Sequence, residues 1–182
     1  VQKAPGSQWT ATAAGAVIVE SVGAGPCITA ATVGKVIDLG QTDPSDMGSA
    51  MAPAAADTIK MHLQDLNRTP DYYDLIVTGD LGKVGMAIAE QLFIKDGVVP
   101  HPSYSDCGVL LYDESQGVDS GGSGCGCSAS MLCGPLLQKV IQGKINRLLL
   151  VATGALMSPV TSYQGETIPA IAHAVAIESQ GG

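Results

Sequence analysis

The stretch YDLIVTGD at residues 73–80 is a short apolar run that ends in Gly-Asp, and it leads into GKVGMAIAEQLFIKDG at residues 82–97. In the second stretch, Val84, Ile88 and Leu92 recur at helical spacing. Together the two stretches predict a buried strand that is followed directly by a helix. Apolar strands that alternate with helical patterns are typical of layered α/β proteins.

The residues upstream of this unit predict three more elements. Residues 13–21 and 27–38 are rich in β-branched side chains and are separated by GAGP, so we expect two strands joined by a turn, a hairpin that opens the fold. Residues 43–70 predict a long helix, with Asp46 as its N-cap and Pro70 just beyond its end.

The residues downstream predict a helix and two strands. The helical pattern covers residues 131–144, and apolar strands follow at 145–156 and 168–179. The order of elements is then ββαβα, a loop, and αββ. We therefore expect one domain over residues 1–182, an α/β fold with a mixed sheet of about five strands covered by helices.

Composition argues against several classes of protein. With 182 residues and 46% hydrophobic residues, the chain can bury one sizeable core. Its net charge of −8 and the absence of a Lys/Arg-rich stretch argue against a nucleic-acid partner. The apolar runs are too short to span a bilayer, which predicts a soluble protein. Five cysteines are an odd number that suits thiols in a reducing compartment.

Residues 120–134, SGGSGCGCSASMLCG, place three of these cysteines among small residues. Cys125 and Cys127 have Cys-x-Cys spacing, whereas zinc sites take about four ligands and usually open with Cys-x2–4-Cys. Glycines here let the backbone come close to a ligand or to a neighbouring helix. The N–H groups at a helix start favour an anion. Two interpretations stay open, helix packing without a ligand and anion binding, and no metal site is expected.

Two aspartates are candidates for a binding site. Asp80 follows Gly79 where a strand ends and a helix begins, which is where open α/β sheets place functional groups, although it could simply cap that helix. Asp106 precedes Cys107 at the junction between a loop and the next element. A neighbouring carboxylate disfavours a thiolate, so we expect this pair to serve binding or structure rather than catalysis. The alternative for Asp106 is a cap on an element that starts at Gly108.

The three histidines predict different environments. His62 lies beside Gln64 and Asp65 on the polar side of its predicted helix, which indicates a surface residue. His101 lies between two prolines in a loop, and its role stays open. His173 alternates within an apolar strand, where a histidine is more often a satisfied core residue than a base. No Ser-His-Asp or Cys-His set can be read from the spacing.

Five stretches carry a family resemblance: ATVGKVIDLGQTDPSDMGSAMAPAAADTIK (31–60), DYYDLIVTGDLGKVG (71–85), SDCGVLLYD (105–113), GGSGCGCSAS (121–130) and ETIPAIAHAVAIES (166–179). Together they resemble the stage V sporulation protein AD family of spore-forming bacteria, a family of the thiolase-like superfamily. Subunits of that superfamily contain two similar halves, and this chain resembles the C-terminal half. The acylated cysteine of the superfamily stands in the other half.

The resemblance extends to the ketoacyl synthase III branch of the superfamily. In that branch the C-terminal half supplies a histidine just after an apolar strand and an asparagine in a glycine-rich turn before a helix. The histidine position falls at about Gly79, next to Asp80, and the asparagine position falls at about Cys125. Glycine cannot transfer a proton or stabilise an oxyanion. The resemblance therefore implies a protein without catalytic residues, and the alternative is an acyltransferase or condensing enzyme of the thiolase class.

The family resemblance also implies a ligand, partners and a location. The ligand is dipicolinic acid, whose uptake across the inner membrane of the developing spore the family serves. The partners are the N-terminal half of the same protein, other proteins of the uptake channel and, for a homodimer, a second copy. We expect a peripheral protein at the inner membrane, facing a reducing compartment.

The predicted ligand site must hold a flat aromatic dianion in an acidic protein. Such a ligand needs an apolar slot and hydrogen-bond donors, and a calcium ion bound with it, or a protonated carboxyl, would offset the repulsion from nearby aspartates. No other cofactor is expected. The predicted ligand-binding residues are Gly79, Asp80, Asp106, Cys107, Gly124 and Cys125.

Overall fold

A mixed β-sheet of five strands forms the centre of the fold. The computed structural model describes residues 3–98 and 102–180. The strand order is β2-β7-β6-β3-β4, where β3 runs parallel to β4 and β6, and β7 runs antiparallel to β6 and β2. The predicted α/β fold is confirmed. The strands are β2 (Cys27–Val33), β3 (Leu75–Thr78), β4 (Tyr104–Asp106), β6 (Arg147–Ala155) and β7 (Ala170–Glu178), and a separate two-stranded sheet pairs β1 (Trp9–Thr10) with β5 (Gly122–Ser123).

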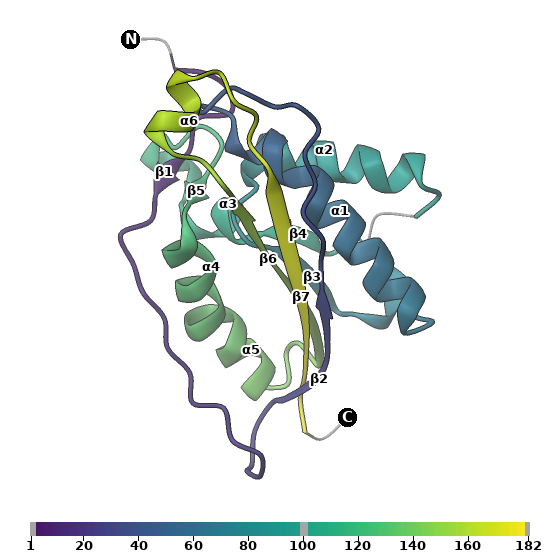
Figure 1. The fold of residues 1–182 in the computed structure, drawn as a ribbon. Helices are drawn as coiled ribbons and strands as arrows, with labels where there is room; N and C mark the ends of the chain where they lie inside the picture. The colour runs from purple at the N-terminus through teal and green to yellow at the C-terminus, as the bar shows by residue number, and fades with distance from the viewer. Residues whose placement is uncertain (1–2, 99–101, 181–182) are drawn as a thin grey trace.

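Helices cover both faces of the sheet (Figure 1). One core lies between the sheet and helices α1 and α2, and a second lies between the sheet and α3 to α5. Adjacent strand residues enter different cores, so Ile76 joins the first and Val77 the second, which explains the continuous apolar runs. The helices are α1 (Met47–Asp65), α2 (Gly82–Lys95), α3 (Cys107–Leu111), α4 (Cys125–Met131), α5 (Leu137–Ile141) and α6 (Pro159–Tyr163), with short turns η1 (Pro70–Tyr72), η2 (Glu114–Gln116) and η3 (Leu132–Leu136).

Helix α1 begins where the sequence predicts. The Asp46 side chain accepts a hydrogen bond from the Ser49 N–H at 3.2 Å, which is the expected N-cap, and the helix ends at Asp65. Its core face is rich in alanine and packs on the alanines of β7. Where α1 meets α2, a Cβ atom on Gly85 would lie 2.6 Å from the carbonyl oxygen of Gly48. Glycine at this crossing therefore lets the two backbones touch.

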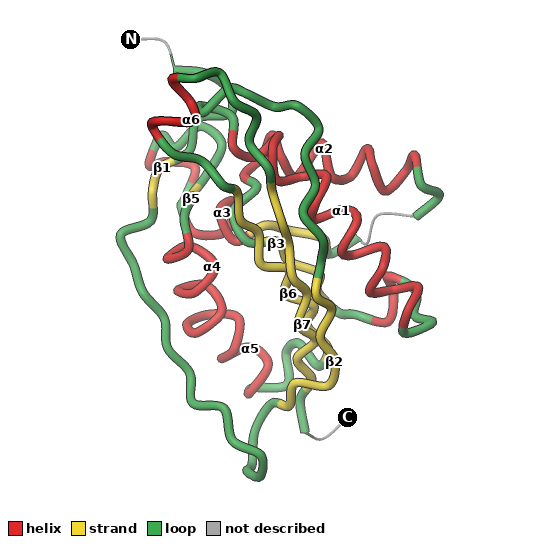
Figure 2. The backbone as a smooth tube through the Cα atoms, in the orientation of Figure 1, coloured by secondary structure: helices red, strands yellow, loops and turns green. Residues whose placement is uncertain are grey.

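The predicted opening hairpin is wrong. Residues 13–21 form no strand, and β2 pairs antiparallel with β7 instead (Figure 2). The segment between β1 and β2 is extended and runs beside α4, so close that a Cβ on Gly126 would lie 2.3 Å from the Ala13 carbonyl oxygen. The β-branched composition of residues 13–21 predicts a strand, but β2 takes its hydrogen bonds from the long apolar strand β7 and leaves these residues unpaired by any strand. Ile18 is left 89% exposed.

The helix predicted at residues 82–97 is confirmed as α2. Gly85, Ala89 and Phe93 are buried against α1 and the sheet. Val84, Ile88 and Leu92, whose spacing predicts this helix, are half-buried and line a shallow apolar groove, and Ile88 and Leu92 also pack against the first core.

The helix predicted at residues 131–144 begins earlier than expected, at Cys125. Its middle, η3, is a π-type turn that contains Pro135, and Gly134 departs from helical geometry (φ −95°, ψ −106°). Proline lacks an N–H and crowds the preceding turn, which accounts for the irregularity. The strands predicted at 145–156 and 168–179 are confirmed as β6 and β7.

Two of the three histidine predictions are wrong. His62 is fully buried rather than on the surface, because α1 turns it toward β2 and Tyr73. His173 is exposed rather than in the core, and its Nδ1 accepts a hydrogen bond from the Gly34 N–H. His101 lies outside the described residues.

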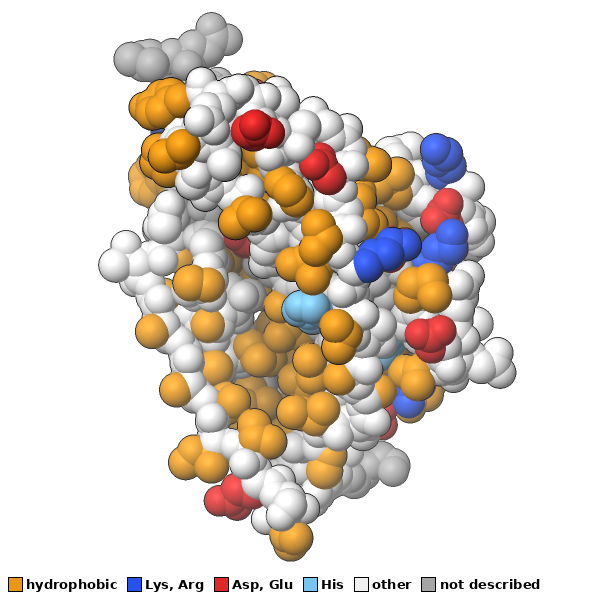
Figure 3. Space-filling model, in the orientation of Figure 1, with side chains coloured by type: hydrophobic (Ala, Val, Ile, Leu, Met, Phe, Trp, Pro, Cys, Tyr) orange, Lys and Arg blue, Asp and Glu red, His pale blue; other side chains and the backbone are white. Residues whose placement is uncertain are grey.

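Apolar side chains gather on one face of the molecule around a hollow (Figure 3). Exposed apolar residues on the described surface include Ile18, Val33 and Leu156, which are 89%, 84% and 72% exposed. Large exposed apolar patches are typical of surfaces that contact a protein, a membrane or a ligand. Within the described residues, no helix is long and apolar enough to cross a membrane.

Candidate functional site

The candidate site lies at the edge of the sheet where three parallel strands end. Thr78 at the end of β3 pairs with Val151 of β6 on one side and with Asp106 of β4 on the other. Because the carboxyl ends of parallel strands share one edge, the polar residues that follow them come together. Asp80, Asp106 and Thr153 therefore converge from segments far apart in the sequence, and the glycine turn before α4 joins them.

Asp80 connects the end of β3 to the start of α4. Its Oδ2 accepts a hydrogen bond from the Gly124 N–H at 2.7 Å, and its Oδ1 accepts one from the Thr153 hydroxyl at 2.7 Å. Burial raises the pKa of this carboxyl, and the hydrogen bonds from Thr153 and Gly124 lower it. Asp80 does not cap α2, which was the alternative for this residue. The residue before that helix is Leu81, and the Asp80 carboxylate points to α4.

Asp106 is fully buried, and five donors satisfy its carboxylate. Oδ2 accepts from the Thr78 hydroxyl at 2.7 Å and from the Leu81 N–H at 2.9 Å. Oδ1 accepts from the N–H groups of Gly82, Gly108 and Val109.

Asp106 therefore caps α3, the alternative left open by the sequence, and it also holds the start of α2. Burial raises its pKa, and the hydrogen bonds from Thr78, Gly82 and Leu81 lower it. Both carboxylate oxygens of Asp106 are thus occupied by donors within the protein, and the side chain has no exposed surface.

The cysteines near the site differ sharply in exposure. All five are free thiols. Cys107 and Cys127 are fully buried in the second core, and burial raises the pKa of Cys107 above its ordinary range and that of Cys127 to about 12. A raised pKa disfavours the thiolate, which is the nucleophilic form of cysteine. Cys125 is exposed at the first turn of α4, directly after Gly124.

Gly79 has no room for a side chain. A Cβ atom there would lie 2.6 Å from the Thr153 hydroxyl oxygen and 2.9 Å from the Thr153 backbone nitrogen. A larger residue at this position requires β6 to move. The glycine is thus fixed by packing against its neighbouring strand.

Two residues of this site, Thr153 and Gln8, were not predicted from the sequence. Thr153 is polar and follows the apolar run of β6, which is the same signal that singled out Asp80. Gln8 donates to the carbonyl oxygens of Asp80 at 2.8 Å and Gly122 at 2.7 Å, and so joins two of the site's segments. No local signal marks Gln8, because its partners lie 72 and 114 residues away.

One protein family matches this chain along nearly its whole length. Residues 1–178 match the family described as stage V sporulation protein AD. The chain belongs to this family. It is 52% identical over 181 residues to the stage V sporulation protein AD of Bacillus subtilis (strain 168), which covers 100% of this chain and 54% of that protein. The chain therefore spans about half the length of the curated relative it matches.

Solved structures show what fold the family member shares with other proteins. The tetronic acid condensing enzyme AbyA1 superposes with a TM-score of 0.50 at 14% identity, over 88% of this chain and 49% of that one. The 3-oxoacyl-[acyl-carrier-protein] synthase III of Aquifex aeolicus gives 0.37 at 14% identity, over 72% and 39%. The first likeness identifies the fold as resembling half of a thiolase-like condensing enzyme, as the sequence analysis expected.

Proposed function

We propose that this chain is part of a non-catalytic sporulation protein that binds dipicolinic acid and takes part in its uptake into the developing spore. The observation that carries the proposal is the match to the stage V sporulation protein AD family along residues 1–178. The site geometry supports the non-catalytic part of it.

Three features of the site argue against condensing chemistry. Gly79, at the position where the resemblance expects a histidine, carries no acid or base and has no space for one. Cys107 and Cys127 are buried thiols with raised pKa values. Cys125 is exposed, but no described histidine approaches it to act as a base, since His62 and His173 bond elsewhere.

Within the predicted set, two residues suit direct contact with a ligand. Gly124 and Cys125 form the turn at the surface, and Gly79 and Asp80 lie behind it at the strand end. Asp80 holds the Gly124 N–H, so the backbone of this turn is kept in one conformation. Asp106 and Cys107 lie deeper and act through the elements they position.

The dianionic charge of dipicolinate sets a condition on this site. Asp80 and Asp106 lie near it in a protein with net charge −8, so a bare dianion would meet repulsion. Calcium bound together with the ligand removes this conflict. We therefore expect tighter binding of dipicolinate when calcium is present than when it is chelated.

The remaining half of the full-length protein is the partner that suits the exposed apolar surface. Residues 13–21 include Val17, Ile18 and Val19, which are extended and exposed, and the sheet face around Val33 is open. These surfaces have the apolar character of an interface within a protein. Association with the inner spore membrane would then run through other proteins of the uptake system.

Two measurements on the full-length protein distinguish this function from the acyltransferase alternative. Calorimetric titration with dipicolinate should give saturable binding. Incubation with acyl-CoA, followed by mass spectrometry of the intact protein, should give no stable acyl adduct. An adduct on a cysteine, together with no dipicolinate binding, would replace the proposal with the enzyme.

A further inference from the structure

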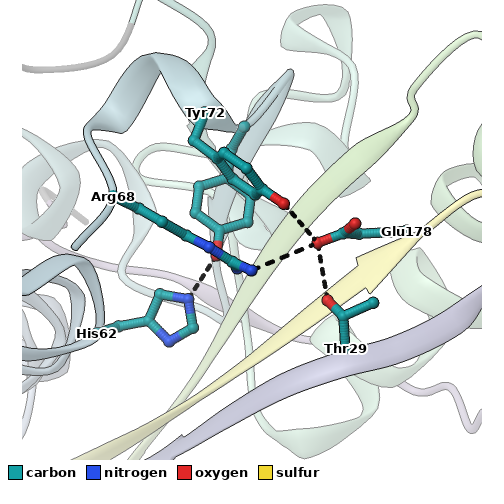
Figure 4. Close-up of polar contacts among 6 residues, drawn as sticks. Thr29, His62, Arg68, Tyr72 and Glu178 are labelled. Atoms are coloured by element: carbon teal, nitrogen blue, oxygen red, sulfur yellow. Dashed lines mark hydrogen bonds and ion pairs between the residues drawn. The ribbon is translucent and has the colours of Figure 1, made fainter. Parts of the chain in front are cut away.

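A cluster of polar side chains, buried at one end and exposed at the other, lies at the opposite edge of the sheet from Asp80. Figure 4 shows six of its residues. Strands β3 and β6 begin at this edge, and β7 ends there. We call the cluster the Arg68 network. Its side chains come from β2, α1, the turn after α1, η1 with the residue that follows it, and β7: Thr29, Thr32, His62, Arg68, Tyr72, Tyr73 and Glu178.

His62 is the buried end of the Arg68 network. The side chain is fully buried, and both ring nitrogens have partners. Nδ1 lies 2.8 Å from the Thr32 hydroxyl, and Nε2 lies 2.5 Å from the Tyr73 hydroxyl. That tyrosine hydroxyl also accepts a hydrogen bond from Arg68 Nη1 at 2.7 Å.

One arrangement places the protons of Tyr73 and His62 all in hydrogen bonds. A guanidinium can only donate, so the Tyr73 oxygen accepts from Arg68. The hydroxyl proton of Tyr73 then goes to His62 Nε2, which must be unprotonated to accept it. His62 is therefore neutral with its proton on Nδ1, where Thr32 accepts it.

The exposed end of the network holds the edge strand β2. Glu178 Oε1 accepts from the Thr29 hydroxyl at 2.8 Å and from the Tyr72 hydroxyl at 3.1 Å, and lies 3.8 Å from Arg68 Nη2. The register between β2 and β7 slips between Ile28 and Ala30, so Thr29 is the residue left out of the ladder. The Thr29 side chain thus ties down the point where backbone pairing is interrupted.

The charged groups around His62 affect how readily its ring takes up a second proton, at Nε2. Arg68 faces it across Tyr73 with a fixed positive charge, and the Arg68 guanidinium stacks on Tyr72 at 4.1 Å, with Arg147 on the same ring at 4.5 Å. Asp65, on α1 itself, is the carboxylate that favours a charged His62. Glu178 lies beyond Arg68 and is already bound by three groups.

We propose that the Arg68 network is a pH-responsive clamp on β2, closed while His62 is neutral and opened when His62 Nε2 takes up a proton. A protonated Nε2 donates to the Tyr73 oxygen, which leaves the Tyr73 hydroxyl proton without its acceptor. It also places a second cation beside Arg68. Tyr73 and Arg68 then separate, and Arg68 no longer holds Glu178 and, through it, Thr29.

The direction of the pH effect follows from linkage. Burial, with Arg68 adding to it, lowers the pKa of His62 from 6.5 in the closed cluster. The open form therefore binds one proton more than the closed form at pH values below 6.5 and above the lowered value. The clamp is complete above pH 6.5 and is lost as the pH falls through that window.

Hydrogen exchange on the full-length protein tests the clamp. After correction for the intrinsic rate, exchange in residues 27–33 should rise between about pH 7 and about pH 5, by up to about tenfold per pH unit. His62→Gln cannot titrate and should remove this rise. His173→Gln is the matched control, because His173 is exposed and contacts Gly34 near the other end of β2, and it should keep the wild-type response.

Two results would overturn the clamp. One is flat protection of residues 27–33 across this range in the wild type, and the other is an equal rise in His62→Gln. If His62→Gln does not fold, the His62 ring resonance in the wild-type NMR spectrum decides, since titration near 6.5 would mean that the ring is not held neutral.

Discussion

The carboxylate of Asp80 accepts a hydrogen bond from the backbone N–H of Gly124, 2.7 Å away, and so joins the end of β3 to the start of α4. These residues are 44 positions apart in the chain. Because Thr153 binds the other carboxylate oxygen, one side chain fixes the positions of two strands and a helix around the candidate site. The geometry of the candidate site thus depends on this buried carboxylate.

Replacement of Asp80 with alanine should destabilise the protein. The Gly124 N–H and the Thr153 hydroxyl would lose their acceptor, which costs about 1–3 kcal/mol for a group this buried. Urea unfolding of the full-length protein measures the change. Asp119→Ala removes an exposed carboxylate with a 3.6 Å ion pair to Lys3 and should change stability by less than about 0.5 kcal/mol. Equal effects of the two variants would contradict the role assigned to Asp80.

Replacement of Asp106 with alanine should cost more stability than Asp80→Ala, about 3 kcal/mol or more, because several buried donors lose their acceptor at once. The sequence alone predicted Asp106 as a ligand-binding residue, for which this substitution would weaken dipicolinate binding and leave the fold largely intact. Since Asp106 is a buried cap, we expect a lowered melting temperature with affinity retained in the protein that remains folded. Weakened affinity with unchanged melting would restore Asp106 as a contact residue.

Gly79→Ala should destabilise the protein by about 1–3 kcal/mol, since its Cβ would meet Thr153 at 2.6 Å. Gly154 provides the control in the same strand as Thr153, because a Cβ there meets no described atom within 4 Å. Gly154→Ala should leave the melting temperature unchanged or slightly raised. If both variants melt like the wild type, the strand end has room for a side chain, and the packing argument against a histidine fails.

Thiol labelling should separate the cysteines by burial. In the native protein at about pH 8, Cys107 and Cys127 should resist iodoacetamide, because they are buried and their pKa values are raised. Cys125 is exposed and should react. Peptide mapping by mass spectrometry gives the extent at each site, and labelling in urea shows that each cysteine can react once unfolded. Native modification of Cys107 at the rate of Cys125 would refute the buried placement.

The features that the sequence predicts best are helix caps and apolar strands and helices, because they depend on residues only a few positions apart. The N-cap Asp46, the strand before Thr78 and helix α2 were all predictable, because capping residues and apolar periodicity act within a few positions. Strand pairing is not local. The hairpin failed because β2 pairs with β7, whose residues lie more than 130 positions away.

The position of the candidate site could be predicted in part from the sequence, but the structural role of each aspartate could not. Asp80 follows a predicted strand end, which placed it at this edge, whereas the strand that ends at Asp106 was not predicted. Which one caps a helix depended on tertiary contacts, and Asp106 rather than Asp80 holds the start of α2. His62 was misassigned for a related reason, since its polar helix neighbours hid a buried partner in Tyr73.

Titration of dipicolinate into the full-length protein, for the wild type and for Cys125→Trp, tests most directly whether this sheet edge is the ligand site. The tryptophan would fill the space in front of the Gly124 turn, and because Cys125 is exposed, the variant should melt like the wild type. We expect saturable binding by the wild type and at least about a tenfold loss of affinity in the variant. Equal affinities in two proteins of equal stability would place the ligand elsewhere and contradict the proposed site.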